Sequence, residues 1–198
     1  AAALETVRGM IHEPGTVAYV RQQEPAGLGH AVWCARHLIH DEPVAILLAD
    51  DLILGPSCLA EMVASYQGGN MVAVMDVPKS KTGSYGIITP GADHGQLIEV
   101  SGLVEKPEPA NAPSNIGVVG RYIIESEVFV QLGTQDRGAG NEVQLTDALA
   151  RQIGKVPFHG FRFSGERFDC GSKIGFLQAN IAFAMSRDDL AEPLARWI

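Results

Sequence analysis

The feature that most constrains the fold is an apolar run, Val44 to Ala49, that ends in two acids, Asp50 and Asp51. A short continuous apolar run of this kind is typical of a strand buried on both faces. In open α/β sheets, ligands bind beyond the carboxyl ends of such strands, where carboxylates offer hard oxygen ligands to Mg²⁺ and a bound phosphate. Taken alone, acids at a strand end are more often turn residues, so their meaning depends on the rest of the chain.

Short β-rich runs alternate with helical patterns, which indicates an α/β fold with a mixed, mostly parallel sheet. We expect strands at 17–22, 44–49, 71–77, 85–89, 97–104, 116–124, 158–163 and 167–169, and helices at 28–38, 58–66, 125–132, 144–153 and from 172 onward. No internal repeat or linker divides the sequence. We therefore expect one domain over residues 1–198.

Composition excludes several classes of function. The net charge of −8, without a basic cluster, disfavours a nucleic-acid partner or an anionic membrane surface. Three cysteines without a C-x-x-C pair favour a reducing compartment over a disulfide framework or a thiolate zinc site. No apolar run approaches the length of a membrane span, and no signal-peptide pattern is present, so we expect a cytoplasmic protein. The histidines show neither metal-ligand spacing nor a Ser–His–Asp grouping.

A pair of glycines, Gly27 and Gly29, follows the first expected strand and opens a helix. The dinucleotide fingerprint G-x-G-x-x-G is incomplete here, because Val32 occupies a position that needs a small residue. Glycines at a helix N-terminus do let the backbone approach a base or a phosphate. Gln22, just before them, offers an amide donor and acceptor to a base edge, although a surface amide is an equally common alternative.

A second group of polar residues surrounds two other expected strands. Glu105 and Lys106 end a strand, and such a pair can bind sugar hydroxyls and a phosphate, or can form an ordinary solvated ion pair. Tyr85 and Gly86 begin a strand, and the glycine leaves room for a sugar beside the backbone, although a plain turn has the same pattern.

Asp169 is a further acid at a strand end, followed by Gly171 and the start of a helix. With Asp50 it would form a carboxylate pair from two separate strands, which suits one Mg²⁺ on a triphosphate. The alternative is an acid favoured by the helix dipole. Lys173 lies in the first helical turn, where the dipole disfavours a cation, which hints at an anionic partner. An exposed lysine there is nonetheless common.

Together, and in this order, these motifs resemble the family of bacterial UTP–glucose-1-phosphate uridylyltransferases. The motifs are Arg21-Gln22, Gly27–Ala31, Leu48–Asp51, Tyr85-Gly86, Val104–Pro107, Pro113–Asn115, Val119–Tyr122, Glu142–Asp147 and Asp169–Lys173. The resemblance runs from about Val17 to the last helix. It implies a Rossmann-like nucleotidyltransferase fold and a homo-oligomer, a dimer or a tetramer.

The reaction implied by the resemblance is attack of glucose-1-phosphate on the α-phosphorus of UTP, which releases pyrophosphate and forms UDP-glucose. Such a reaction depends on positioning and charge stabilisation and needs no protein nucleophile. By the same resemblance, Gln22 and the loop with Gly27 and Gly29 would hold the uracil, and Asp50 and Asp169 would ligate Mg²⁺.

The resemblance also implies a sugar side of the site. Tyr85 and Gly86 would border the glucose, Glu105 would bind its hydroxyls, and Lys106 would face the sugar phosphate. Lys173 matches a family lysine near the phosphates. Asp50, Lys106, Asp169 and Lys173 are therefore the candidate catalytic residues.

Two features depart from the family. Asp51 is an extra acid where other members carry an apolar residue, so the resemblance does not settle which of the adjacent acids binds the metal. The family also begins with a glycine-rich G-x-G-T-R loop and a lysine segment that cradle the triphosphate, and this sequence contains neither. We therefore expect the 198 residues to lack the N-terminal part of the family domain and, as an isolated polypeptide, to be inactive and unstable.

The alternatives differ in substrate or in activity. The chain could act on another base or sugar, such as dTTP or galactose-1-phosphate, or it could be a catalytically inactive subunit that binds a sugar nucleotide.

Overall fold

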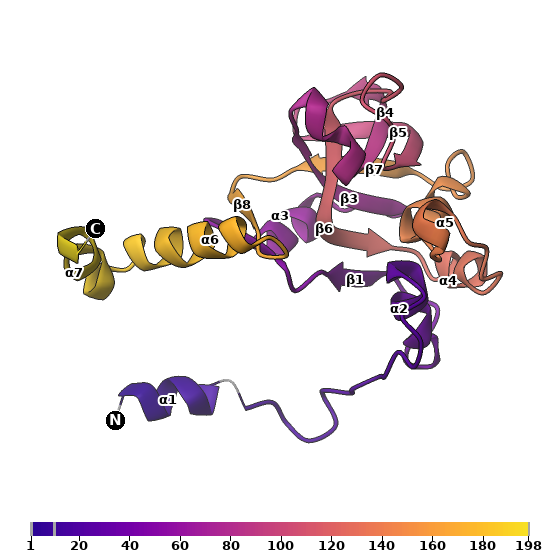
Figure 1. Cartoon of the computed structure of the whole chain (residues 1–198). Coiled ribbons are helices and arrows are strands. Elements are labelled where there is room, and N and C mark those ends of the chain that lie inside the picture. The colour runs from indigo at the N-terminus through magenta and orange to yellow at the C-terminus, as the bar shows by residue number, and fades with distance from the viewer. Residues whose placement is uncertain (1, 10, 198) are drawn as a thin grey trace.

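The structure, a computed structural model, describes residues 2–9 and 11–197. Its centre is a six-stranded sheet in the order β1-β6-β3-β7-β5-β4 (Figure 1). The strands are β1 (Val44–Leu47), β3 (Asn70–Asp76), β4 (Gly86–Asp93), β5 (Leu97–Glu105), β6 (Ile116–Ile124) and β7 (Phe158–Arg162). Strands β2 (Asp51–Leu54) and β8 (Glu166–Asp169) form a separate antiparallel ribbon.

The expected α/β fold with a mixed sheet is confirmed, but its strands are not mostly parallel. Among the described strands, β3 and β7 form the one parallel pair, and the other pairs are antiparallel. The cause lies in the middle of the chain, where β4 and β5 form a hairpin and β6 runs antiparallel to β1, β3 and β4. Short turns can join antiparallel strands, whereas parallel strands need long crossovers.

Helices lie on both faces of the sheet. The α-helices are α1 (Ala2–Gly9), α2 (Leu28–Cys34), α3 (Cys58–Ser65), α4 (Glu127–Leu132), α5 (Leu145–Ala150), α6 (Lys173–Met185) and α7 (Asp188–Trp197), and short 3₁₀ turns are η1 (Arg36–Leu38), η2 (Lys79–Ser84) and η3 (Ala139–Asn141). Helices α2, α4 and α5 contact one another beside the sheet, whereas α6 and α7 project away from it (Figure 1). Ser57 caps α3, because its Oγ accepts the Ala60 N–H at 3.3 Å.

Strand β3 divides the hydrophobic core into two layers. Its residues Val72 and Val74 belong to a cluster that also contains side chains of α2, α4 and α5. Met71 and Ala73 point to the opposite face and pack with Met62 of α3. Burial on both faces explains why this strand is a continuous apolar run rather than an alternating one.

The two expected strands nearest the N-terminus need correction. Strand β1 is not buried on both faces, because Val44 and Ile46 pack on the core while Leu47 is 51% exposed. It lies at the sheet edge, where among the described residues only β6 pairs with it. Residues 17–22 have no regular secondary structure and pair with no described strand, and Tyr19 is 96% exposed. β-Forming residues do not make a strand without a hydrogen-bonding neighbour.

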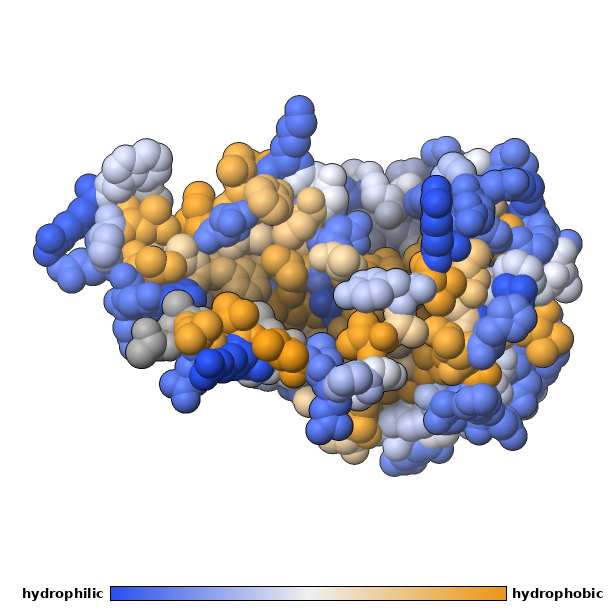
Figure 2. Space-filling view, turned by 90° about the horizontal axis from the view of Figure 1, so that it is seen from below, coloured by the Kyte–Doolittle hydropathy of each residue, from blue (hydrophilic) through white to orange (hydrophobic). Residues whose placement is uncertain are grey.

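Exposed apolar side chains gather on the lower face of the molecule, around a hollow beside α6 (Figure 2). Those of α6 are Ile174, Phe176, Leu177, Ile181 and Met185. Within residues 2–9 and 11–197, no helix has the length and apolar character needed to cross a membrane.

Candidate active site

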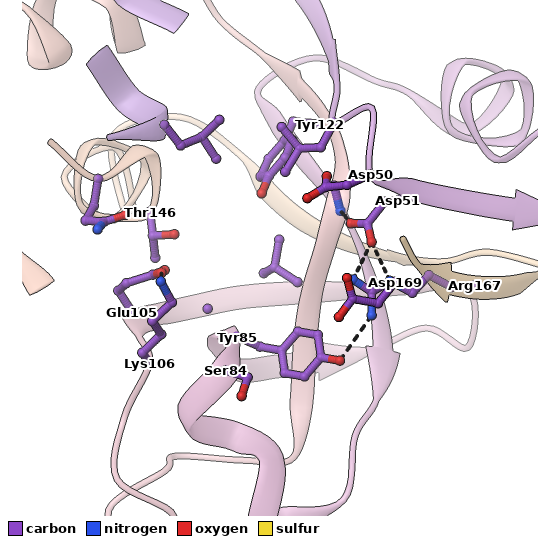
Figure 3. A pocket seen from close by; sticks show the side chains of 16 residues that line it. Asp50, Asp51, Ser84, Tyr85, Glu105, Lys106, Tyr122, Thr146, Arg167 and Asp169 are labelled. Atoms are coloured by element: carbon purple, nitrogen blue, oxygen red, sulfur yellow. Dashed lines mark hydrogen bonds and ion pairs between the residues drawn. The ribbon is translucent and has the colours of Figure 1, made fainter. Parts of the chain in front are cut away.

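A cavity of about 320 Å³ opens where β1, β5 and β8 end (Figure 3). Its lining includes six residues that the sequence singled out: Asp50, Tyr85, Gly86, Glu105, Lys106 and Asp169. Acids from the ends of β1 and β8 lie on one side, and Glu105 and Lys106 lie on the other (Figure 3). These residues are far apart in the chain, and the sheet topology brings them to one opening.

The acidic side of the cavity holds two carboxylates that converge on Gly171. A Cβ atom built on Gly171 would lie 3.1 Å from Asp169 Oδ1 and 3.3 Å from Asp50 Oδ2. The Cys170 N–H donates to the Asp50 carbonyl at 2.8 Å, which ties the end of β8 to the turn between β1 and β2. Asp50 is exposed and Asp169 is half-buried, so both carboxylates are accessible from the cavity.

These two acids suit a Mg²⁺ ion that also binds a substrate phosphate. No cluster of three or more His, Cys, Asp or Glu side chains able to hold a metal occurs among residues 2–9 and 11–197. Mg²⁺ usually takes one or two protein carboxylates and completes its coordination with water and phosphate oxygens. Asp50 and Asp169 therefore fit this ion by donor type and number.

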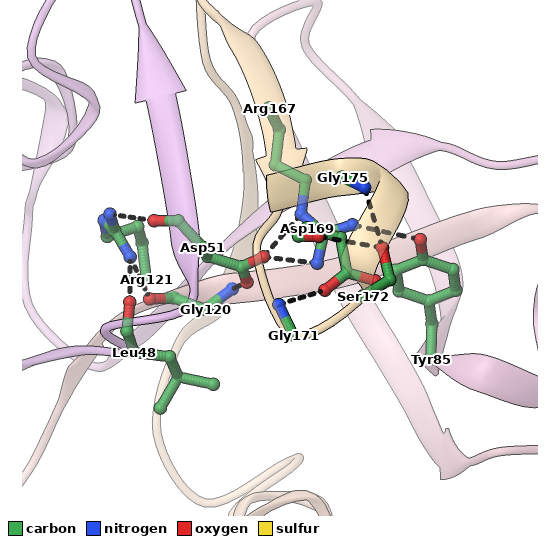
Figure 4. A network of polar contacts seen from close by, with 10 residues as sticks. All are labelled: Leu48, Asp51, Tyr85, Gly120, Arg121, Arg167, Asp169, Gly171, Ser172 and Gly175. Carbon is green, nitrogen blue, oxygen red and sulfur yellow. Dashed lines mark hydrogen bonds and ion pairs between the residues drawn. The ribbon is translucent and has the colours of Figure 1, made fainter. Parts of the chain in front are cut away.

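Asp51 has a different environment from its neighbour (Figure 4). It is 5% exposed, one carboxylate oxygen pairs with the Arg167 guanidinium, and the other accepts the Gly120 N–H at 2.6 Å. Burial alone would lower the pKa of Arg167, but the Asp51 carboxylate outweighs it and raises that pKa above its usual value. Both carboxylate oxygens of Asp51 thus have partners within the protein, and Asp50 is the acid that remains accessible.

Arg121 holds the turn that separates these two acids. Its Nη1 donates to the carbonyls of Leu48 at 3.0 Å and Gly120 at 2.7 Å, and its Nη2 donates to the carbonyl of Asp51 (Figure 4). A side chain on Gly120 would lie 2.6 Å from both Asp51 Oδ2 and Leu48 Cβ. Arg121 and the bare Gly120 backbone therefore fix the direction in which Asp50 leaves the sheet.

The opposite side of the cavity is built around Gly86. A Cβ atom there would lie 3.3 Å from both Glu105 Oε2 and Thr146 Oγ1, so glycine keeps the space between these two polar groups open. Lys106 Nζ lies 3.4 Å from Glu105 Oε1. Lys106 has a φ of 45°, and its N–H donates to the Tyr85 carbonyl at 3.0 Å. A non-glycine residue whose backbone adopts the left-handed conformation costs about 1–3 kcal/mol in conformational strain, and such strain is concentrated at functional sites.

The loop with Gly27 and Gly29 lies beside the cavity, but neither glycine lines it. A Cβ atom on Gly29 would lie 2.7 Å from the Val143 carbonyl, so close packing explains this residue. Gln22 Nε2 donates to the Gly27 carbonyl at 3.1 Å and lies 3.0 Å from His30 Nδ1. Gln22, Gly27 and Gly29 do not line the cavity, although Leu28 between the glycines does.

Lys173 also lies apart from the other candidates. It is exposed at the start of α6 and does not line this cavity.

Sequence reasoning missed three prominent lining residues: Thr146, Tyr122 and Arg167. Thr146 belongs to the Glu142–Asp147 motif and Tyr122 to the Val119–Tyr122 motif, and these two motifs gave the available signals. Tyr122 is buried, and burial, reinforced by the charge of Glu105, raises the pKa of its phenol. Nothing local marks Arg167, because its partner Asp51 is 116 residues away in the sequence.

Known proteins resemble this chain over most of its length. The sequence pattern of the nucleotidyl transferase family matches residues 5–185. A UTP–glucose-1-phosphate uridylyltransferase from Komagataeibacter xylinus is 51% identical over 175 residues, which cover 87% of this chain and 61% of that protein. The chain thus spans about three fifths of the length of this curated relative.

Solved structures agree in fold. A UDP-glucose pyrophosphorylase complexed with UDP-glucose is 37% identical, with a TM-score of 0.87 over 94% of this chain and 72% of the other. A UTP-bound UGPase from Acinetobacter baumannii is 32% identical, with a TM-score of 0.87 over 99% of this chain and 70% of the other. With a family match that covers residues 5–185, the chain belongs to the nucleotidyl transferase family.

Proposed function

We propose that the protein joins UTP and glucose-1-phosphate to form UDP-glucose and pyrophosphate. The observation that carries this proposal is the convergence of Asp50 and Asp169 at one end of a cavity whose other end is built from Glu105, Lys106 and Gly86. A relative 51% identical to this chain bears the name UTP–glucose-1-phosphate uridylyltransferase, which supports the choice of substrates.

On the nucleotide side, Asp50 and Asp169 hold Mg²⁺ in this proposal. The bound ion supplies positive charge that neutralises phosphate oxygens. Gln22 uses its amide nitrogen for both of its hydrogen bonds within the described chain, so its Oε1 remains as an acceptor. This oxygen can accept the N3–H of uracil, a proton that neutral cytosine lacks.

On the sugar side, Glu105 accepts hydrogen bonds from glucose hydroxyls and Gly86 leaves room for the ring. Lys106 places its ammonium group toward the sugar phosphate and balances the charge of the attacking oxygen. Lys173 is assigned to the phosphates by the resemblance alone. We further propose that the protein is a cytoplasmic homo-oligomer, a dimer or a tetramer.

The test uses the complete gene product, with whatever sequence flanks residues 1–198. Purified protein is supplied with UTP, glucose-1-phosphate and Mg²⁺, and UDP-glucose and pyrophosphate are quantified together. Asp50→Asn and Asp169→Asn should each lower turnover about a hundredfold or more, as loss of transition-state charge stabilisation does. Asp188→Asn, an exposed acid in the first turn of α7, is the matched control and should leave turnover unchanged.

Parallel assays decide between the candidate functions. Faster turnover with dTTP or with galactose-1-phosphate would replace the proposed substrates. Binding of UDP-glucose without turnover by the complete protein would favour an inactive sugar-nucleotide-binding subunit.

A further inference from the structure

The cavity wall contains a buried ion pair that connects the two sides of the site. The Asp51 and Arg167 side chains are 7% and 12% exposed. Asp51 follows the exposed Asp50 directly in the chain and lies opposite Asp169 in the pairing of β2 with β8. The backbone therefore holds Asp51, the anionic partner of Arg167, next to both acids of the cavity, Asp50 and Asp169.

The same guanidinium reaches Tyr85, which lies between the two sides of the site (Figure 3). Arg167 directs Nε and Nη2 at Asp51 and donates from Nη1 to the Tyr85 hydroxyl at 3.1 Å. Its central carbon lies 5.6 Å from the centre of the Tyr85 ring. The planar fork of an arginine can hold two partners at a fixed angle, which the point charge of a lysine cannot do.

Both partners of Arg167, Asp51 and Tyr85, are also connected to the backbone around the site. Asp51 Oδ2 accepts the Gly120 N–H at 2.6 Å, and Arg121 holds the Asp51 carbonyl. Tyr85 is connected to the sugar side through its carbonyl, which accepts the Lys106 N–H at 3.0 Å. A continuous set of contacts therefore runs from the acids at Asp50 and Asp169 to Lys106.

We infer that Arg167 is a positioning residue, which fixes Tyr85 and the sugar side of the site relative to the Asp50–Asp169 pair. It acts through Asp51 and Tyr85 and needs no contact with substrate. Since each of its three guanidinium nitrogens already contacts a protein partner, its role is geometric. The kinetic part of this inference rests on the proposed function.

A double-mutant cycle in the complete protein tests the coupling. Arg167→Lys keeps the charge and removes the fork, and Tyr85→Phe removes only the hydroxyl. Each should lower kcat/KM for glucose-1-phosphate about tenfold, as misplacement of less than an ångström can, while KM for UTP stays within about twofold. The double variant should be no slower than the slower single variant, because both changes break one interaction.

Arg162→Lys is the matched control. Arg162 also makes two hydrogen bonds to one carboxylate, that of Asp93, but this pair is exposed and lies outside the cavity lining. The control should retain wild-type kinetics. Losses that multiply in the double variant, or that affect UTP and glucose-1-phosphate equally, would overturn the inference.

A second readout does not depend on activity. In protein labelled with 3-fluorotyrosine, Tyr85→Phe identifies the ¹⁹F signal of residue 85, and Arg167→Lys should shift or broaden that signal alone. An unchanged Tyr85 signal would refute the positioning role. Failure of the wild-type protein to form UDP-glucose would instead refute the proposed function, and the ¹⁹F comparison would still decide the inference.

Discussion

Asp50 is exposed and its neighbour Asp51 is buried, so the substitution of Asp by Asn should lower activity at position 50 and stability at position 51. In Asp51→Asn, the amide oxygen can still accept from Arg167, but the new NH₂ group then faces the Gly120 N–H that Asp51 Oδ2 accepts at 2.6 Å. The Arg167 side chain, 12% exposed, also loses its countercharge. Breaking a buried ion pair in this way costs about 3–5 kcal/mol, a large part of the stability of a typical domain.

Asp50→Asn should behave in the opposite way. Asp50 is exposed, and its carboxylate accepts no hydrogen bond from the described residues, so the free energy of unfolding should change by less than about 0.5 kcal/mol. Turnover should fall about a hundredfold or more, because a ligand of the proposed cation is lost.

Thermal denaturation followed by circular dichroism measures the difference. At about 2–4 °C per kcal/mol for a protein of this size, the melting temperature of Asp51→Asn should drop by roughly 10 °C, and that of Asp50→Asn by a degree or two at most. Equal stability of the two variants would refute the assignment of Asp51 to structure. Retained turnover in Asp50→Asn, together with wild-type stability, would refute the assignment of Asp50 to the cation.

Three further outcomes follow from individual contacts. Gly86→Ala places a methyl group 3.3 Å from both Glu105 Oε2 and Thr146 Oγ1, so kcat/KM for glucose-1-phosphate should fall about tenfold to a hundredfold in steady-state assays without a lower unfolding midpoint. Burial raises the pKa of Cys58 to about 11, so mass spectrometry should find this thiol unalkylated by iodoacetamide at pH 8 until the protein unfolds. Burial, followed by the charge of Glu105, raises the pKa of Asp147, so the folded protein holds that proton more tightly than the unfolded chain. Stability is therefore lost as pH rises above the ordinary value of 3.8, and urea titrations should find Asp147→Asn at least as stable as wild type at pH 7 and without that advantage below pH 3.8.

The sequence predicts best those elements whose signal is local. The strand β3 is predicted correctly because its burial on both faces gives a continuous apolar run, and α3 is found at its expected start. Strands β4 and β5 and the helix after Ser172 are found because their signals are also local. Strand pairing is a long-range property, and the expectation that 17–22 forms a strand fails because no described strand lies beside it.

In the candidate site, too, the sequence predicts what depends on local signals and misses what depends on long-range contacts. Asp169 and Glu105 could be selected because each ends a strand, and Asp50 because it closely follows β1, since strand ends meet at sheet edges. The separate roles of Asp50 and Asp51 could not be predicted, because only burial and a distant Arg167 distinguish them. β2 was missed for a related reason, since its pairing partner β8 lies more than a hundred residues away.

The central claim is that Asp50 and Asp169 together hold a divalent cation beside the nucleotide. The most direct measurement is a Mn²⁺ titration of the complete protein with UTP, followed by water-proton relaxation, which reports protein-bound Mn²⁺. We expect this relaxation enhancement in the wild type and in Asp188→Asn, and its loss in both Asp50→Asn and Asp169→Asn. Enhancement equal to that of the wild type in these two variants would contradict the account.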